Sequence, residues 1–428
     1  MTDAGGASET STRWSRAVAA AEQRYGRHAL TLAMLAAATY IYVWRQPHIL
    51  TSPTFWAEDG LIFFKGAFEH GLGAVLTPNN GQLWLFQRIV AGLAIPLPVS
   101  IQPALYAGVA VATAVLSCSI VLSSRWRWQV PLAARFVCLL ALLCSPAVDQ
   151  EALGTLTNSH WWLAIGLVLL GMLYDPLSRR LKIGEVVFTA VTALSGFAAI
   201  YAIPSLGVRA YRNRSRHSVA VLGVALSGVL VQLVYLHLSS VRNGDLRDTV
   251  MHPITTILVL VRRVFGCAAL GGTNLFQMWP KRIPDWWLGL IVFALIVSLA
   301  AIWIVARRLE IGALLLAAVG GWLLATWELW TWKAPGLALW GLGWRYFLVP
   351  VAILYVSLIV TWSPGAPRRA LAGVACVLLA AGIMSGYHVA ALPSSNWTAF
   401  TRCMEARVTT CSVVIPPAWT VTVDPRGH

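Results

Sequence analysis

Repeated apolar runs of roughly 20 residues limit the fold of this chain more than any other feature. A helix of that length crosses the hydrocarbon core of a bilayer because it satisfies every backbone polar group internally. Hydrophobic residues make up 58% of the chain and charged residues only 11%, whereas a soluble domain carries about a quarter charged residues. The apolar runs show no long alternating pattern. The sequence therefore predicts an all-α integral membrane protein.

The runs predict a polytopic bundle of about eleven spans within residues 29–391. The expected spans are 29–44, 101–122, 131–147, 161–174, two short spans within 185–211, 218–239, 286–306, 311–329, 345–362 and 369–391. The two short spans are expected to turn outside, near Ser195 and Gly196. The apolar stretch 254–272 carries Arg262 and Arg263 in its middle, and we expect a re-entrant or interfacial helix there.

Basic residues, which give the chain a net charge of +15, lie mostly in short loops between apolar runs. This is the positive-inside pattern of a multi-pass protein of the cell membrane, and it indicates membrane lipids, not nucleic acid, as the surroundings of the chain. It predicts a cytoplasmic N-terminal segment at 1–28. The acidic and aromatic loop 45–100 and the tail 392–428 are predicted to lie outside.

The seven cysteines show no metal-ligand spacing. Five of them lie in or beside apolar runs, where cysteine behaves as a small hydrophobic residue. Cys403 and Cys411 differ because they belong to the polar tail that is predicted to lie outside. A disulfide persists in that compartment, so we expect these two residues to form one.

The strongest local signal is FWAEDGLIFF, in which Glu58 and Asp59 lie between aromatic residues just after the first span. Two adjacent carboxylates near the membrane surface fit a general base or an oxygen-donating metal site. An ordinary solvated acid pair in a loop is the structural alternative. Residues alone do not choose between them.

The same loop continues as PNNGQLWLFQR, where Asn79, Asn80 and Gln82 stand close to Trp84. Amide side chains beside tryptophan suit the hydroxyl groups and ring faces of a sugar. The same residues also suit an aromatic belt at the membrane interface.

A second external segment, DQEALGTLTNSHWW, carries Asn158 and His160 at the start of the fourth span. The histidine could carry a proton or hydrogen-bond a substrate. A structural histidine at a helix end is the alternative.

The third signal is GWRYFLVP, where Arg345 and Tyr346 open a late span. Arg345, Arg262 and Arg263 are all predicted near the outer boundary, against the positive-inside bias. Their predicted position therefore indicates an anionic partner. A lipid phosphate fits the planar fork of donors on arginine. Snorkelling of Arg345 to the interface is the simpler alternative.

The chain contains no GxxxxGK[ST], HExxH or GxSxG motif. It resembles the C-type glycosyltransferase superfamily (the GT-C fold), whose members are integral membrane enzymes that take a sugar from a polyprenyl-phosphate carrier. The resemblance rests on FWAEDG, TNSHWW, the hairpin from ALSGF to Pro204, and GWRYFLVP, which occur in the expected order between about residues 50 and 350. The tail is shorter than the soluble domain of many members, which argues against action on polymers.

The resemblance implies that an acid in the first external loop, Asp59 or Glu58, is the general base in an inverting displacement. It also implies that Arg345, and after it Arg262 and Arg263, bind the donor phosphate. Sugar or acceptor contacts fall to Asn79, Asn80, Gln82, Trp84, Asn158, His160 and Tyr346. Some members use a divalent cation such as Mg or Mn, for which Asp59 and Glu58 would be the ligands.

The expected partners are a polyprenyl-phosphate-linked sugar and a glycan, lipid or protein acceptor of the cell envelope. A transporter or flippase of lipid-linked sugars is the leading alternative, since it would use the same boundary arginines without chemistry. It predicts charges deep within several spans, whereas the ionisable residues of the candidate site lie near the predicted outer edge. A membrane scaffold that binds envelope proteins is a third reading.

Overall fold

The fold was obtained as a computed structural model of the full chain. It describes residues 28–126, 130–239, 259–271, 309–331, 343–360, 379–407 and 410–427, together with a few isolated positions. The predicted cytoplasmic segment 1–28 and the predicted span 286–306 lie almost wholly outside the described residues. Much of the predicted span 369–391 also lies outside them.

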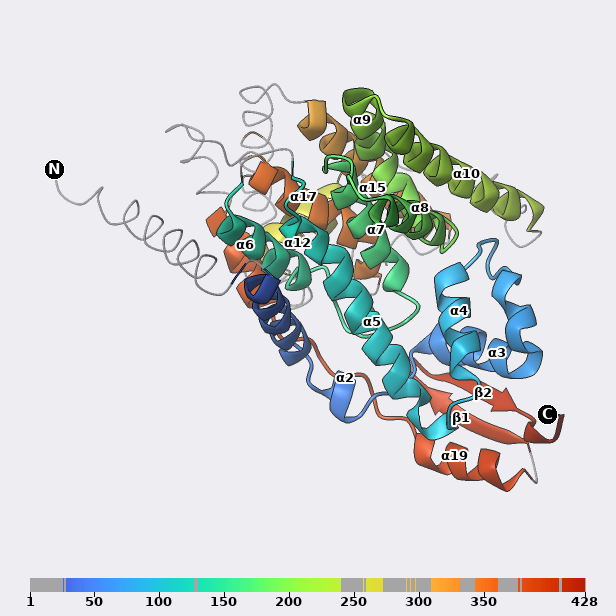
Figure 1. The fold of residues 1–428 in the computed structure, drawn as a ribbon. Coiled ribbons are helices and arrows are strands. Elements are labelled where there is room, and N and C mark those ends of the chain that lie inside the picture. Colours follow the sequence, from blue (N-terminus) through green and yellow to red (C-terminus); the bar gives the residue numbers. More distant parts are fainter. Residues whose placement is uncertain are drawn as a thin grey trace.

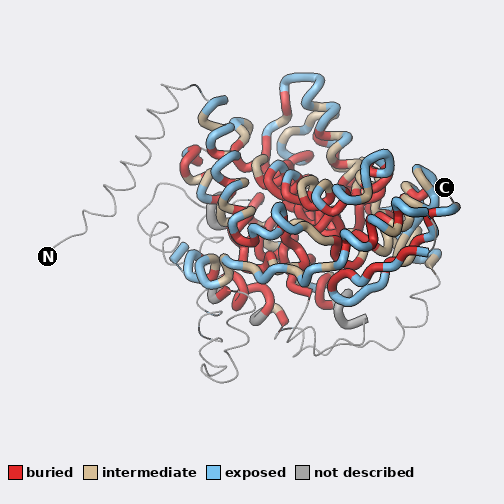
Figure 2. Tube along the Cα trace, turned by 90° about the horizontal axis from the view of Figure 1, so that it is seen from below, coloured by how far each residue is buried: buried red, intermediate tan, exposed pale blue. Residues whose placement is uncertain are grey.

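The described part of the chain is mostly helical, as predicted, with one two-stranded hairpin near its end (Figure 1). The bundle contains the apolar helix His28–Trp44. It also contains α5 (Gln102–Ser119), α6 (Leu132–Leu143), α7 (Ser159–Gly171), α8 (Arg179–Ala193), α9 (Ile203–Asn213), α10 (Arg216–Leu238), η6 (Leu260–Gly266), α12 (Cys267–Leu270), α15 (Leu309–Thr331) and α17 (Leu348–Val360). Every residue of α7 is buried, and the buried positions gather in the middle of the molecule (Figure 2). The apolar α7 packs against α5, α8, α9 and α17, so it is the centre of the bundle.

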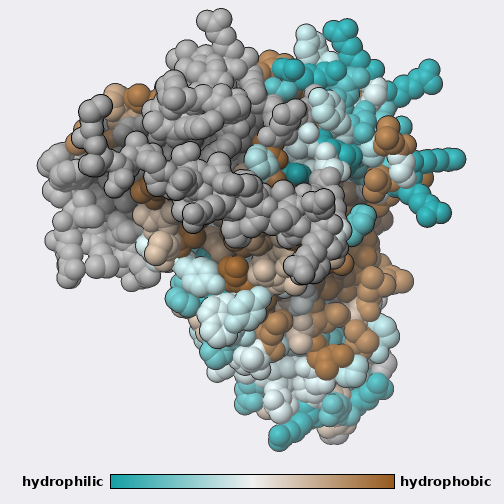
Figure 3. Space-filling view, turned by 60° about the vertical axis from the view of Figure 1, so that its left-hand side comes forward, coloured by the Kyte–Doolittle hydropathy of each residue, from teal (hydrophilic) through white to brown (hydrophobic). Residues whose placement is uncertain are grey.

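Three described helices are long and apolar enough to cross a membrane, namely Val99–Leu122, Arg216–Leu238 and Leu309–Thr326. The predicted spans 29–44, 131–147, 161–174 and 345–362 correspond to shorter apolar helices, His28–Trp44, Leu132–Leu143, Ser159–Gly171 and Trp344–Ser357. On the face drawn in Figure 3, hydrophobic side chains gather between two hydrophilic ends. This distribution is typical of a membrane protein.

The helical segment 185–211 is interrupted near Ser195 and Gly196, where a turn was predicted. α8 ends at Ala193, and η5 (Phe197–Ala202) follows after Ser195 and Gly196 and leads into α9. Gly196 has a φ of 118°, which favours glycine because a side chain would be strained there. The chain therefore reverses direction in three residues beside the start of α7.

The long loop 45–100 and the tail 392–428 pack together into one module. We call it the external module, after the side of the membrane that was predicted for both segments. Its N-terminal part contains α2 (His48–Thr51), η1 (Asp59–Phe64), α3 (Lys65–His70), η2 (Gly71–Leu76), α4 (Leu85–Ala94) and η3 (Val99–Ile101). Its C-terminal part contains α19 (Trp397–Ala406), β1 (Cys411–Ile415), β2 (Trp419–Val423) and η8 (Pro425–Gly427). The two strands are antiparallel, with Cys411 opposite Val423.

An aromatic cluster forms the core of the external module. The ring centroid of Phe55 lies 4.8 Å from that of Trp397, and the centroid of Phe64 lies 6.1 Å from that of Phe400. Buried aromatic pairs at such distances stabilise beyond their buried area by about 0.5–1.5 kcal/mol. The first loop and the tail were predicted separately to lie outside, and this core requires them to share one side of the membrane.

The predicted disulfide is confirmed, since Cys403 at the end of α19 is bonded to Cys411 at the start of β1. Their Cα atoms are 5.8 Å apart, within the usual range for a bridge. The bond joins the tail helix to the hairpin.

The end of the bundle remote from α19 carries an ion-pair network (Figure 1). The fully buried Arg209 contacts Asp175 at 2.9 Å and Glu185 at 2.7 Å, and Arg125 contacts Glu185 at 2.6 Å. Hydrogen bonds from Ser215 and Ser218 and the charge of Arg209 outweigh burial and lower the pKa of Asp175 to about 2. Arg125 and the run beginning at Arg209 were both predicted on the inner side, and the structure brings Arg125 and Arg209 together at Glu185.

Arg45 joins three parts of the chain and gives a testable prediction. Its guanidinium is 1% exposed and donates to the carbonyl oxygens of Leu143, Ser145, Val148, Gly386 and Tyr387 at 2.8–3.1 Å. Lysine has three donors and cannot reproduce this fork. We expect Arg45→Lys to lower the free energy of unfolding by about 2–3 kcal/mol. Thermal unfolding in detergent measures the change, with the exposed Arg180→Lys as the control.

Candidate functional site

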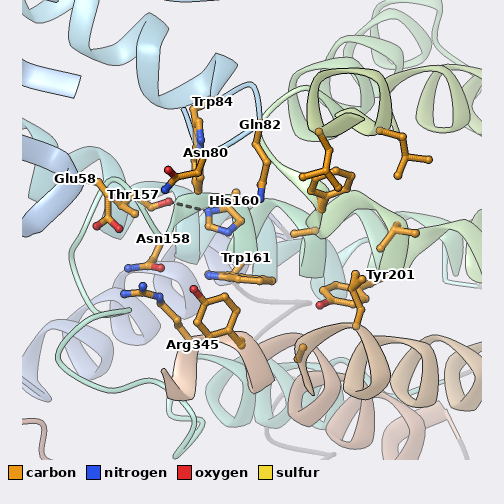
Figure 4. Close-up of a pocket in the computed structure, with 18 residues that line it drawn as sticks. Glu58, Asn80, Gln82, Trp84, Thr157, Asn158, His160, Trp161, Tyr201 and Arg345 are labelled. Carbon is orange, nitrogen blue, oxygen red and sulfur yellow. Dashed lines mark hydrogen bonds between the residues drawn. The ribbon is translucent and has the colours of Figure 1, made fainter. Parts of the chain in front are cut away.

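A cavity of about 160 Å³ lies between the external module and the bundle (Figure 4). It holds roughly ten water-sized groups, which is comparable with one sugar unit. It is lined by Glu58, Asn80, Gln82, Trp84, Thr157, Asn158, His160, Trp161, Phe197, Ala198, Ile200, Tyr201, Leu233, Leu236, Leu324, Ala325, Arg345 and Tyr346. These residues come from the external loop, the start of α7, η5, the end of α10, α15, and η7 (Trp344–Phe347).

The structure brings together most of the residues that the sequence singled out. The predicted residues in the lining are Glu58, Asn80, Gln82, Trp84, Asn158, His160, Arg345 and Tyr346. Asp59, Asn79 and Arg263 are not in the lining. The side chain of Arg262 lies outside the described residues.

Three polar atoms of lining residues have no hydrogen-bond partner among the described residues. They are Oε2 of Glu58, Oδ1 of Asn158 and Nε1 of Trp161. Asn158 is fully buried and Trp161 is 7% exposed. A buried polar atom without a partner costs about 1–3 kcal/mol, so a ligand hydroxyl group that reached one of these two acceptors or this donor would offset that cost.

A tight turn carries Asn80 to the cavity. Asn80 and Gly81 both have positive φ values, 51° and 71°, as in the type I′ turn that Asn-Gly favours. Asn79 and Gln82 exchange backbone hydrogen bonds at 2.9 and 3.1 Å across it. A Cβ at Gly81 would lie 3.2 Å from Cα of Leu236, so the glycine allows the turn to pack on the end of α10. Asn79 is thus a turn residue.

His160 lies between two lining tryptophans, with ring centroids 5.0 Å from Trp84 and 4.3 Å from Trp161. Its Nδ1 is 2.7 Å from the carbonyl oxygen of Thr157. Because a carbonyl oxygen only accepts, Nδ1 donates this bond, and the neutral ring presents a lone pair at Nε2. The imidazole is therefore fixed in one tautomer beside the cavity.

The side chain of Arg345 is held at the cavity by an ion pair. Its Nη1 lies 2.9 Å from Oε2 of Glu151, and its guanidinium lies 5.3 Å from the ring centroid of Tyr346. Gly343, with a φ of 91°, begins the turn that leads into η7. Arg345 is separated from Glu151 by 194 positions in the sequence. The pair therefore joins the loop before α7 to the turn before α17.

One further acid, Asp149, and one further arginine, Arg263, lie near this ion pair. Burial raises the pKa values of Asp149 and Glu151, while the charge of Arg345 lowers them. Arg263 is fully buried in η6, with its guanidinium carbon 4.2 Å above the ring of Trp344. Arg263 is a neighbour of the acid pair and not part of the cavity lining. Only Arg345, of the described arginines predicted to bind phosphate, is in position to touch a ligand there.

The carboxylate of Asp59 is occupied by hydrogen bonds within the protein. Its carboxylate accepts hydrogen bonds from the backbone N–H of Leu156 at 3.1 Å and from the N–H and hydroxyl of Thr157 at 2.7 and 2.6 Å. Burial raises its pKa to about 7, although the bonds from Thr157 lower it. Asp59 is 2% exposed and outside the lining, whereas Glu58 lines the cavity. The adjacent acids thus face different surroundings.

The expectation of a divalent cation gains no support from the described residues. They contain no group of three or more His, Cys, Asp or Glu side chains that could hold a metal ion. The carboxylate oxygens of Asp59 are already engaged with residues 156 and 157.

Asp59→Asn is expected to change the pH dependence of stability. A raised folded-state pKa means that the carboxyl of Asp59 stabilises the fold fully below pH 4 and loses this contribution as the pH rises towards 7. Asn does not titrate, so the variant should lose less stability between pH 5 and pH 8 than the parent. Melting curves in detergent at the two pH values measure this difference. If Asp59→Asn loses as much stability between pH 5 and pH 8 as the parent does, the raised pKa of Asp59 is contradicted.

Sequence reasoning missed several lining residues. Thr157 and Trp161 belong to the TNSHWW segment that was already selected, so that segment was a usable signal. Phe197 and Tyr201 belong to the hairpin from ALSGF to Pro204, which carried part of the resemblance, but neither residue was given a role. Glu151 was noted only as part of an external acidic stretch, and its pairing with Arg345 has no signal in a single sequence.

No known family model matches this chain, and neither a curated protein nor a solved structure shows significant similarity to it. The function is therefore inferred from the geometry of the site. It offers a carboxylate oxygen that no described residue bonds, an arginine, amide and indole groups, and an apolar half formed by residues such as Phe197, Leu233 and Leu324. Such a cavity can bind an amphiphile that has a polar, anionic head.

Proposed function

We propose that this chain is a membrane glycosyltransferase that moves a sugar from a polyprenyl-phosphate carrier to a cell-envelope acceptor at the external face. One observation carries the proposal. Glu58, one of whose carboxylate oxygens has no hydrogen-bond partner among the described residues, and Arg345 line a single cavity of sugar size. A base for a hydroxyl group and a cation for a phosphate are the two groups that such a transfer needs.

Glu58 is the general base in the proposed reaction. Its carboxylate takes the proton of the acceptor hydroxyl while that oxygen bonds to the anomeric carbon. The bond from this carbon to the phosphate oxygen breaks, and the polyprenyl phosphate leaves with the electron pair. Arg345 stabilises the charge that collects on the phosphate. A single displacement inverts the anomeric configuration.

The two halves of the cavity suit the two ends of the proposed donor. Asn158, Trp161 and Asn80 offer partners for sugar hydroxyl groups. Phe197, Leu233 and Leu236 form an apolar wall against the end of α10, where a prenyl tail would lie. The prenyl tail and the headgroup of the donor then meet at the boundary between the bundle and the external module.

The proposal includes the full predicted topology, with about eleven spans, a cytoplasmic N-terminus and an external C-terminus. The first loop and the C-terminal tail share one hydrophobic core, which supports their location on the same side of the membrane. A divalent cation stays an expectation, which transfer measured with and without a chelator would test.

The function is tested with purified protein in proteoliposomes that contain radiolabelled polyprenyl-phosphate arabinose, mannose or ribose and an envelope extract as acceptor. We expect labelled product together with an equal amount of released polyprenyl phosphate. Empty liposomes are the control. Movement of intact donor between the leaflets without release of polyprenyl phosphate would favour the flippase alternative and contradict the proposal.

A further inference from the structure

The tail hairpin touches the chain immediately before Glu58. The backbone N–H of Ala57 donates to the carbonyl oxygen of Pro416 at 2.8 Å. Pro416 belongs to the turn between β1 and β2. A residue more than 350 positions away thus fixes the backbone beside the proposed base.

The hairpin also covers the chain immediately after Asp59. A Cβ built at Gly60 would lie 2.5 Å from Cδ1 of Ile415 and 3.0 Å from Cγ2 of Val421. Both side chains are buried, at 1% and 0% exposure, so their displacement would disturb a packed core. Gly60 has no positive φ, and close approach alone requires glycine here.

The rest of the tail supports this contact. Trp397 on α19 packs edge-on against Phe55, and the Cys403–Cys411 disulfide joins α19 to β1. The tail helix and the hairpin therefore both contact the segment 55–60.

We infer that the C-terminal hairpin is a positioning element of the candidate site, which fixes the backbone around Glu58 and so aims its carboxylate into the cavity. Ala57, Gly60, Ile415 and Pro416 act through Glu58 and do not touch the ligand. The catalytic consequence rests on the proposed function, but the mechanical coupling does not. A misplacement of about 1 Å at a reacting group lowers a rate by roughly 10²-fold.

The test compares Gly60→Ala, Ile415→Ala, and the double variant that combines them. The added methyl group should displace the hairpin in the first, and the shortened side chain should make room for it in the double variant. Val414→Ala is the matched control, since Val414 lies on the outward face of the same strand. Hydrogen exchange of the peptide 55–64 and the rate of sugar transfer are measured for each variant.

Gly60→Ala is expected to speed exchange in the peptide 55–64 and to lower the maximal transfer rate by about 10- to 100-fold. In the double variant, exchange of the peptide 55–64 and the transfer rate should both return most of the way to the parent values. Val414→Ala should match the parent in both. Unchanged exchange in Gly60→Ala, or a double variant no better than the single, would overturn the inference. If the parent shows no transfer, the proposed function fails, while the exchange measurements still decide the coupling.

Discussion

Glu58→Gln is expected to lower sugar transfer by about 10²- to 10⁴-fold, the range for loss of a general base. The amide has the same shape as the carboxylate, so it fits the same place in the cavity lining. It cannot take the proton of an acceptor hydroxyl at neutral pH. The initial rate with labelled polyprenyl-phosphate sugar, normalised to the amount of protein in the membrane, measures the loss.

The matched control for this variant is Glu69→Gln. Glu69 lies on α3 of the same external module, where it forms a half-exposed ion pair with Lys65 at 3.7 Å. Such pairs contribute roughly 0–1 kcal/mol, so the control should transfer within about twofold of the parent rate. Transfer by Glu58→Gln at the parent rate would show that Glu58 is not the base.

Arg345→Met is expected to have two separable effects. Transfer should fall by about 10²- to 10³-fold, because one group that stabilises the developing charge is lost. The free energy of unfolding should also fall, by about 3 kcal/mol, since Glu151 is left buried without its partner at 2.9 Å. Transfer assays and thermal unfolding measure the two effects.

A second substitution separates stability from chemistry at this pair. Arg345→Met combined with Glu151→Gln removes the unpaired buried charge, so the double variant should regain much of the lost stability. It should stay inactive, because the phosphate still lacks its cation. Arg402→Met on the exposed face of α19 is the control. Recovery of transfer in the double variant would mean that Arg345 serves the fold alone.

Composition and apolar periodicity predicted a helical membrane protein, and a few short motifs predicted many residues of the candidate site. Apolar runs and the scarcity of charge led to a helical membrane protein because the bilayer permits few other folds. Cys403 and Cys411 were found because compartment and polarity decide where a disulfide persists. Asn80, Gln82 and Trp84 lie near Glu58 in the sequence, so one loop delivers them together.

Contacts between distant segments could not be predicted in the same way. The pairing of Arg345 with Glu151, and the packing of Ile415 on Gly60, depend on how the bundle closes. The roles of Glu58 and Asp59 could not be separated either, because adjacent acids look alike until their hydrogen-bond partners are known. Thr157 and Leu156, far away in the sequence, occupy the carboxylate of Asp59 and leave Glu58 to the cavity.

Photo-crosslinking with a polyprenyl-phosphate sugar that carries a diazirine on the sugar ring tests the central claim most directly. If Glu58 and Arg345 enclose the headgroup, mass spectrometry should find labelled peptides around residues 58–84, 157–161 and 345–346. Excess unlabelled donor should abolish the labelling, and Arg345→Met should reduce it. Saturable labelling confined to other parts of the chain would contradict the account.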